Sequence, residues 1–384
     1  MSKTVFILGA GASYSHSNKE FPLINDIFKV AKQLHVTSCK DDINKIKPFF
    51  ECVDLYIKKK LNKNILNIRQ KLDIEDILTN LEIDIEKTES NDLQIVKDRI
   101  IKIILIIFFI LTRKSEYYKK NSEYFLFFDR LKDNDTIITY NWDLLLDNIL
   151  DREKIISNIK NIGQVEDGIL KKQYLRMLMD LSAYRDLSWD RTSAPYEQYN
   201  SKGYYLKLHG SIDWLYCPNE DCGLYSKVFP VKNVSGEYLI ADYKCHECSS
   251  RMKCLIILPI LNKNYRSFPF VKKLWNIAVE EIQSADELVI WGYRLPPTDF
   301  YNRWLFRQKS DQLKKVSIIN PECFRKRKNK ELPKNKIFLE PFLDIFEASK
   351  IVPEISYYEN YSDYINNIKY FERYSKNIGF VRRI

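Results

Sequence analysis

Short, continuous apolar runs that end at glycine or at small polar residues mark the strands of this sequence. Residues 4–8 (Thr-Val-Phe-Ile-Leu) are apolar without alternation and are followed directly by Gly9. Unbroken runs of this length are typical of strands buried on both faces of a parallel sheet. The five runs of this kind are residues 4–8, 136–139, 204–208, 288–291 and 316–319.

Between these runs, apolar residues three and four positions apart predict helices. Leu23, Ile27 and Ala31 place a helix at about 22–34, and residues 144–150 and 275–282 follow the same spacing. Strands that alternate with helices predict an α/β fold with a Rossmann-like parallel sheet. In such sheets ligands bind at the carboxyl ends of the strands.

A long helical insert interrupts this alternation. Residues 41–130 contain no glycine and, apart from Pro48, no proline, and residues 72–83 show helical spacing. The apolar run Ile103–Leu111 is much shorter than the roughly 20 residues of a membrane span, so we expect a buried helix there.

These patterns predict a discontinuous organisation. We expect a Rossmann-like core from residues 1–40, 131–216 and 255–345, with the helical insert at 41–130 and a variable insert or lid at 151–203. A small module spans 217–254, and 346–384 form a C-terminal segment. With 384 residues, 45% of them hydrophobic, the chain can fill one large core or two moderate ones.

Charge adds little to this picture. The chain has 61 Lys and Arg against 51 Asp and Glu, a net charge of +10. The run Arg325-Lys326-Arg327-Lys328 is read as a solvated loop because no stacking aromatics are interleaved, so we expect no direct nucleic-acid binding. No secretory signal precedes residue 4, which predicts a cytoplasmic protein without membrane attachment.

The segment Gly9-Ala10-Gly11-Ala12-Ser13 follows the first strand, where glycines let backbone amides approach a phosphate. The alternative is a tight turn with no ligand. The third glycine of the dehydrogenase fingerprint is replaced by Tyr14, and no acidic residue ends a convincing second strand, which disfavours hydride transfer.

Two further strands end in polar clusters. Thr139, Asn141 and Asp143 follow the run at 136–139, and they could face a ligand or, alternatively, cap the helix that follows. His209 lies after the run at 204–208 beside Gly210, where an imidazole that titrates near neutral pH is a candidate general base.

Four of the eight cysteines have the spacing of a zinc ribbon. Cys217 and Cys222 are separated by four residues, Cys245 and Cys248 by two, and 22 residues lie between the pairs. Cys254 or His246 could replace one of these ligands, and unpaired buried thiols are the alternative. A complete four-thiolate shell leaves no site for water, so the zinc would be structural.

Taken in order, these motifs resemble the sirtuin family. The resemblance rests on Gly9–Ser13, Thr139–Asp143, Leu208-His209-Gly210, the paired cysteines, Asp286–Gly292 and Ile319-Asn320. Residues 288–299 (Leu-Val-Ile-Trp-Gly-Tyr-Arg-Leu-Pro-Pro-Thr-Asp) look especially like the bacterial anti-phage branch, whose members hydrolyse NAD. Residues 22–24 and 258–260 depart from the motifs of true deacylases.

The resemblance implies a role for each motif. Gly9, Ala10, Gly11 and Ser13 would surround the pyrophosphate of NAD, with Gly292 opposite them. Asn320 would lie near the adenosine ribose and Asp143 near the nicotinamide carboxamide, with Thr139 in the same cofactor-binding cluster. Asn141 and His209 would be the catalytic pair.

We therefore predict an NAD glycohydrolase that yields nicotinamide and ADP-ribose and depletes NAD in anti-phage defence. The alternatives are an NAD-dependent lysine deacylase and a non-catalytic sensor of NAD or ADP-ribose. The resemblance also implies a homo-oligomer and a HerA-type hexameric ATPase as partner.

Overall fold

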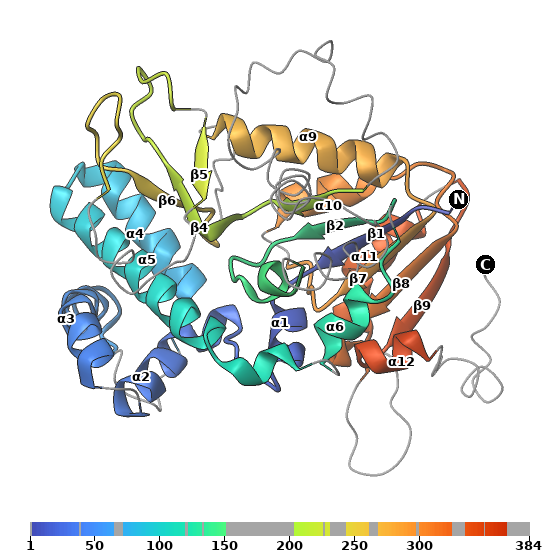
Figure 1. Cartoon of the computed structure of the whole chain (residues 1–384), viewed down its shortest axis with the longest axis horizontal. Coiled ribbons are helices and arrows are strands. Elements are labelled where there is room, and N and C mark those ends of the chain that lie inside the picture. Colours follow the sequence, from blue (N-terminus) through green and yellow to red (C-terminus); the bar gives the residue numbers. More distant parts are fainter. Residues whose placement is uncertain are drawn as a thin grey trace, which may run out of the picture.

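The computed structural model describes most of the chain (Figure 1). The described ranges are 2–37, 40–64, 72–119, 122–132, 134–150, 203–225, 227–230, 243–260, 268–296, 299–324, 335–348 and 350–366. Two predicted features therefore lie outside the described residues: the variable insert, apart from Gly203, and the basic run at 325–328.

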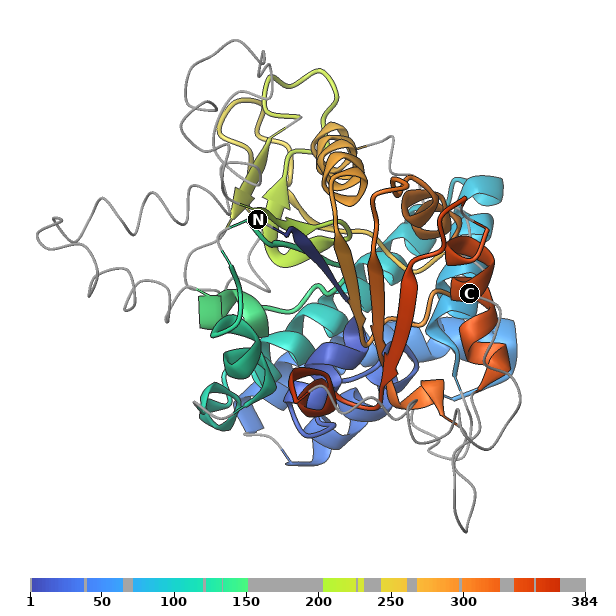
Figure 2. The same cartoon turned by 90° about the vertical axis from the view of Figure 1, so that its right-hand side faces the viewer.

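A six-stranded parallel sheet forms the centre of the molecule (Figures 1 and 2). Its strand order is β3-β2-β1-β7-β8-β9, and every neighbouring pair is parallel. The strands are β1 (Thr4–Leu8), β2 (Thr136–Thr139), β3 (Tyr205–Lys207), β7 (Glu287–Trp291), β8 (Lys315–Ile319) and β9 (Glu354–Tyr358). The order reverses between β1 and β7, which is the point where Rossmann-type sheets bind their ligands.

Five of the six strands, β1, β2, β3, β7 and β8, are buried almost throughout, as the apolar runs predict. Phe6 and Leu8 of β1 belong to one hydrophobic core, whereas Val5 and Ile7 belong to the other. This alternation follows from the two-residue period of side chains along a strand. The predicted α/β fold with a Rossmann-like parallel sheet is confirmed.

Helices cover both faces of the sheet. The core that contains Val5 and Ile7 is closed by α9 (Pro269–Gln283), α10 (Phe300–Arg307) and α11 (Lys336–Phe346). The core that contains Phe6 and Leu8 is closed by α1 (Ala10–His16), α6 (Glu123–Phe128), α12 (Tyr361–Ile365) and the helical insert. Residues 145–150 are also helical, as the spacing at 144–150 predicts. Three short 3-10 turns are η1 (Ile24–Asp26), η2 (Ser115–Tyr118) and η4 (Pro321–Cys323).

The predicted helical insert is confirmed over its described residues. It contains α3 (Lys40–Leu61), α4 (Ile74–Thr88) and α5 (Asn91–Thr112), which with α2 (Ile27–Thr37) form the group of helices beside the sheet in Figure 1. The apolar run Ile103–Leu111 lies inside α5, with most of its side chains buried. No helix in the described part of the chain is long and apolar enough to span a bilayer.

Two local predictions need correction. The helix expected at about 22–34 begins only at Ile27, because Ile24–Asp26 form a 3-10 turn. The chain also enters α1 directly after Gly9, so Ala10–Ser13 are helical and not a turn that precedes a helix.

The sixth strand, β9, lies in the segment 346–384, for which the sequence analysis predicted no strand. Residues 354–358 (Glu-Ile-Ser-Tyr-Tyr) lack the continuous apolar pattern, because Glu354 is exposed and the polar Ser356 is one of the buried positions. The apolar pattern therefore does not predict β9.

A second, three-stranded antiparallel sheet stands at the end of β3. Its order is β5-β4-β6, and its strands are β5 (Val228–Pro230), β4 (Gly210–Tyr216) and β6 (Lys253–Ile256). Because only Leu208 and His209 separate β3 from β4, this sheet is joined closely to the parallel sheet. It carries the cysteine-containing loops.

We expect truncation of a central strand side chain to be costly. Ile7 is fully buried in β1, so Ile7→Ala should lower the free energy of unfolding by about 2–5 kcal/mol in urea titrations. Ile83→Ala is the matched control, because Ile83 is 43% exposed on α4 and should change stability by about 0.5 kcal/mol or less. Equal effects of both substitutions would contradict this view of the core.

Candidate functional site

The loops that leave β1 and β7 meet at the reversal point of the strand order. The amide of Gly9 donates a hydrogen bond to the Trp291 carbonyl at 2.9 Å, and the amide of Gly11 donates to the Gly292 carbonyl at 2.9 Å. A Cβ on Gly11 would lie 2.7 Å from the Gly292 Cα. Gly9 and Gly11 thus allow two backbones to touch, which is a reason for glycine that needs no ligand.

Gly292 is constrained twice. Its φ of +66° lies in the left-handed region, and a Cβ there would lie 2.1 Å from the Ala12 nitrogen. Gly9, Gly11 and Gly292, which the sequence analysis placed around one pyrophosphate, are therefore neighbours. Ala10, the first residue of α1, is exposed beside them.

Ser13 organises the polar groups next to these glycines. Its Oγ donates to Asp143 Oδ2 at 2.7 Å, and it accepts from Asn141 Nδ2 at 3.1 Å. The Tyr124 hydroxyl, 2.9 Å away, can only donate to it, because the single Ser13 proton is already used. The hydrogen-bonding capacity of Ser13 is therefore filled.

Asn141 is fixed at the carboxyl end of β2. Its side-chain Nδ2 also donates to the Gly9 carbonyl at 3.0 Å, and its backbone N–H donates to the Thr139 hydroxyl at 3.1 Å. Thr139 in turn donates to the Leu8 carbonyl at 3.3 Å. Thr139, Asn141, Ser13 and Gly9 thus form one network across the exits of β1 and β2.

Asp143 is buried and has several partners. Besides Ser13, its carboxylate accepts from the Leu145 amide at 3.0 Å, so it caps the helical residues 145–150, as the alternative interpretation proposed. Burial raises the pKa of Asp143, and the Lys207 ammonium opposes that rise.

Lys207 is a buried cation that the sequence analysis did not identify as a site residue. Its Nζ donates to the Asp143 carbonyl at 2.7 Å and lies 3.0 Å from Asp147 Oδ2. Burial raises the pKa of Asp213 to about 6, and Lys207 acts against this shift too. A lysine inside the apolar run of β3 was the available signal, because a buried ammonium requires a partner.

Three consecutive residues carry polar atoms that lack a partner. The Tyr140 hydroxyl, Asn141 Oδ1 and Trp142 Nε1 are buried without a hydrogen bond from any described residue. Leaving such a group unsatisfied costs about 1–3 kcal/mol, so buried polar groups in native proteins are almost always paired, often by water or ligand. Other such atoms, for example Asn302 Oδ1, are scattered over the described part of the chain, whereas three consecutive residues carry them at the exit of β2.

His209 approaches this exit from β3. Its ring packs against the Tyr140 ring with centroids 4.9 Å apart, and the side chain is buried. Asn141 joins the Ser13 network, whereas His209 contacts the preceding residue, Tyr140. The two predicted catalytic residues thus lie at the ends of neighbouring strands.

Asn320 ends β8, two strands from β1. Its side chain accepts a hydrogen bond from the Glu322 amide at 3.0 Å and begins the 3-10 turn η4. It is buried, and the neighbouring Gly292 amide donates to the Ile319 carbonyl. Asn320 therefore lies at the same sheet edge as Gly292.

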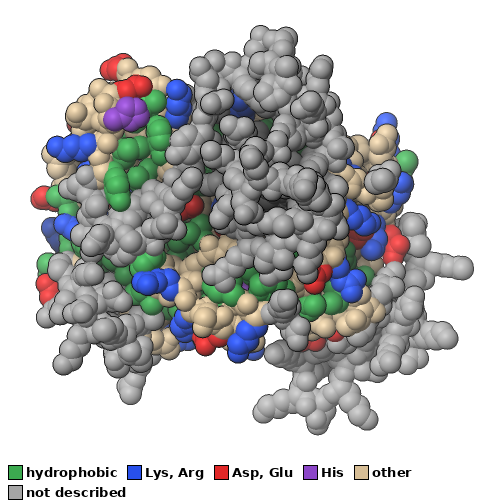
Figure 3. Space-filling view, viewed as in Figure 1, with side chains coloured by type: hydrophobic (Ala, Val, Ile, Leu, Met, Phe, Trp, Pro, Cys, Tyr) green, Lys and Arg blue, Asp and Glu red, His purple; other side chains and the backbone are tan. Residues whose placement is uncertain are grey.

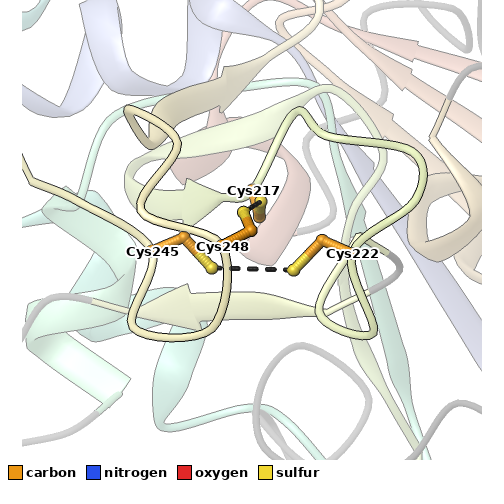
Figure 4. Close-up of side chains that lie close together, drawn as sticks. All are labelled: Cys217, Cys222, Cys245 and Cys248. Atoms are coloured by element: carbon orange, nitrogen blue, oxygen red, sulfur yellow. Dashed lines mark hydrogen bonds between the residues drawn. The ribbon is translucent and has the colours of Figure 1, made fainter.

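The four predicted zinc ligands converge on one point (Figure 4). The Sγ atoms of Cys217 and Cys248 are 3.4 Å apart, those of Cys222 and Cys245 are 3.7 Å apart, and all four lie within 4.8 Å of one another. A tetrahedral zinc ion with Zn–S bonds of 2.3 Å separates its sulfurs by about 3.8 Å, so this set fits zinc.

Neither alternative ligand belongs to this cluster. The Cys254 thiol donates instead to the Ser211 carbonyl at 3.6 Å, and His246 is exposed beside Phe229. The four-cysteine set named from the sequence is therefore the one assembled, and it forms a closed structural site.

Charged side chains are mixed over the visible described surface. In Figure 3, lysines and arginines are interspersed with acidic and apolar side chains on the face seen in Figure 1. This view does not point to a nucleic-acid groove among the described residues that it shows.

No family model matches the chain, and no curated protein matches it. Solved structures similar to it include a Sir2 homologue in complex with NAD, with 13% identity and a TM-score of 0.36 over 95% of this chain and 87% of the other. A mutant Sir2 homologue bound to ADP-ribose gives 12% identity and 0.37, over 100% and 95%. Sir2Tm bound to a propionylated peptide gives 12% and 0.33, over 96% and 91%. Similarity of this degree assigns neither an activity nor a site residue.

We expect the purified protein to contain one zinc per chain. Cys245→Ser should abolish stoichiometric zinc in metal analysis and lower the melting temperature, because a structural zinc contributes its binding energy to folding. Cys52→Ser, in the helical insert away from the cluster, should retain one zinc. Loss of zinc from both variants, or from neither, would contradict the assignment.

Gly292→Ala should be destabilising although it adds a single methyl group. Left-handed strain alone costs about 1–3 kcal/mol, and the contact with Ala12 adds to it. Gly223→Ala is the control, because its Cβ would meet only the side chain of Glu247. Urea titration of both variants measures the difference, and a stable Gly292→Ala protein would exclude the close packing of the two loops.

Proposed function

We propose that this protein is an NAD glycohydrolase that produces nicotinamide and ADP-ribose. The observation that carries the proposal is the set of buried, unpartnered polar atoms at Tyr140, Asn141 and Trp142. They follow β2, beside the reversal point of a Rossmann-type sheet, where dinucleotides bind in this class of fold. The order of the sirtuin-like sequence motifs supports NAD as the dinucleotide.

The pyrophosphate would lie over the contact between the β1 and β7 loops. Gly9, Ala10, Gly11 and Gly292 provide a backbone surface without bulky side chains, and Asn320 lies along the same edge for the adenosine ribose. Ser13 would have to exchange its bond with Asp143 in order to reach the pyrophosphate. In the free protein it therefore acts first as a support for Asn141.

Asn141 is suited to stabilise the reacting ribose. Its Nδ2 is held by Gly9 and Ser13, which leaves Oδ1, the negative end of the amide dipole, without a partner. When the C–N glycosidic bond breaks, both electrons go to the pyridinium ring, which leaves as neutral nicotinamide while positive charge develops on the ribose. A fixed oxygen next to that charge lowers the barrier because no reorganisation is needed.

His209 would serve as the general base. It would accept a proton from the attacking water, whose oxygen then bonds to C1 of the ribose and completes ADP-ribose. Nicotinamide needs no protonation to depart, so the reaction requires no carboxylic acid at the leaving group, unlike an ordinary glycosidase.

Acidic side chains lie near the proposed nicotinamide site. The Lys207 ammonium pairs with Asp147 at 3.0 Å and lowers the pKa values of Asp143 and Asp213, which burial raises. In their ionised form these carboxyls would favour the pyridinium ring of NAD and the developing positive charge on the ribose. The buried carboxyl of Asp143, next to Asn141, would face the carboxamide.

The activity is tested by following free nicotinamide from NAD, with and without an acetyl-lysine peptide. Release without peptide supports hydrolysis, whereas release only with peptide would replace it by deacylation. Binding of NAD without release under either condition would identify a sensor. The activated assembly should be used, since a toxic hydrolase is expected to be restrained.

Substitution of the two catalytic candidates should remove most of this activity. Asn141→Ala and His209→Ala are each expected to lower the rate by about a hundredfold or more, because each removes one stabilising or proton-accepting group. Asn80→Ala and His246→Ala, at exposed positions on α4 and in the zinc module, should leave it unchanged. Undiminished nicotinamide release by both site variants would refute the assignment.

The biological setting follows from the same proposal. We propose that NAD depletion in the bacterial cytoplasm arrests an infected cell, and that self-assembly or a HerA-type ATPase controls the activity. Support for this setting comes from the sequence resemblance alone.

A further inference from the structure

Tyr140 joins a cluster of three aromatic rings that includes His209. The Tyr140 ring contacts the His209 ring, with centroids 4.9 Å apart and planes tilted by 48°, and the Tyr293 ring, with centroids 4.7 Å apart and planes tilted by 36°. The three rings come from the exits of β3, β2 and β7. Three segments that are far apart in the sequence thus meet next to His209, the proposed general base.

Tyr293, the third ring of this cluster, is held by buried polar side chains. The Tyr293 hydroxyl donates to Asp299 Oδ2 at 2.5 Å, and Asn302 Nδ2 lies 2.6 Å from the same carboxylate oxygen. Asn302 Nδ2 also donates to the Tyr293 hydroxyl at 2.6 Å. Asp299 and Asn302 lie at the start of α10 and are almost completely buried.

Apolar packing alone does not require these polar groups. A buried carboxylate costs free energy unless it is hydrogen-bonded, and a phenylalanine at position 293 would fill the same space without needing a carboxylate partner. The polar latch formed by Tyr293, Asp299 and Asn302 fixes the position of the Tyr293 ring more narrowly than apolar contacts would. Because the Tyr140 ring contacts both Tyr293 and His209, that constraint is passed to the imidazole.

We propose that Tyr140 is a positioning residue for His209, and that the latch of Tyr293, Asp299 and Asn302 holds Tyr140 in place. This inference rests on the proposed function for the role of His209 as general base. A base displaced by about 1 Å can lose about a hundredfold in rate, so an orienting ring contact has a direct kinetic consequence.

The ring and the hydroxyl of Tyr140 have separable roles in this proposal. Tyr140→Phe keeps the ring that contacts His209 and should leave the position of His209 unchanged, whereas Tyr140→Leu removes the ring. Tyr293→Phe removes only the hydroxyl that binds Asp299. Tyr357→Leu is the matched control, because Tyr357 is a buried tyrosine of β9 in the same hydrophobic core.

The first measurement requires no activity. The chain has four histidines, so an NMR spectrum of the protein with ¹³C-labelled imidazoles contains few signals. The signal that disappears in the His209→Gln variant is that of His209. Tyr140→Leu and Tyr293→Phe should shift the His209 signal, because the ring current at His209 changes when a tyrosine ring is removed or reoriented. Tyr140→Phe and Tyr357→Leu should not shift it.

The second measurement is nicotinamide release from NAD by the activated assembly. Tyr140→Leu should lower kcat by about a hundredfold, and Tyr293→Phe, which leaves the Tyr140 hydroxyl in place, should lower kcat less and leave KM unchanged. If the wild-type protein releases no nicotinamide, the proposed function fails, whereas the histidine signals still decide the positioning.

The outcome that overturns the inference is equally definite. An unshifted His209 signal in Tyr293→Phe, or an unchanged kcat in Tyr140→Leu, would show that these rings only fill the core and do not position His209. Should Tyr140→Leu fail to fold, Tyr293→Phe decides the question, since it removes one oxygen atom and keeps every ring.

Discussion

The close backbone approach of the β1 and β7 loops is the constraint on which the candidate site depends. Gly9, Gly11 and Gly292 touch where the strand order reverses, and side chains there would collide with backbone atoms. This contact places the Gly9 carbonyl where Asn141 can bind it. The glycines therefore shape the site through packing, whether or not they also accommodate a phosphate.

Next to that contact, Ser13 has all of its hydrogen bonds, whereas Asn141 lacks one. Ser13 uses all of its capacity on Asp143, Asn141 and Tyr124, while Asn141 retains a free acceptor. A network that is saturated behind a side chain and open in front of it fixes that side chain for a ligand. This is the physical basis for assigning chemistry to the exit of β2.

The two sides of this exit are stabilised by different interactions. Asn141 is held by neutral hydrogen bonds, and Lys207, paired with Asp147, binds the Asp143 carbonyl, whereas the His209 ring packs against Tyr140. The four-cysteine cluster lies in the module of the small antiparallel sheet, which Leu208 and His209 join to β3. A zinc ion held by these four thiolates would be structural, with no open position for chemistry.

The sequence by itself predicted the five buried strands, the helical insert and the four cysteines that cluster, because each depends on local apolar period or on fixed spacing. It could not show β9, in which Glu354 is exposed and Ser356 interrupts the apolar residues. Nor could it identify Tyr124, Tyr293 and Asp299 as neighbours of the site. Their roles arise from contacts between residues far apart in the chain, which only the tertiary structure decided.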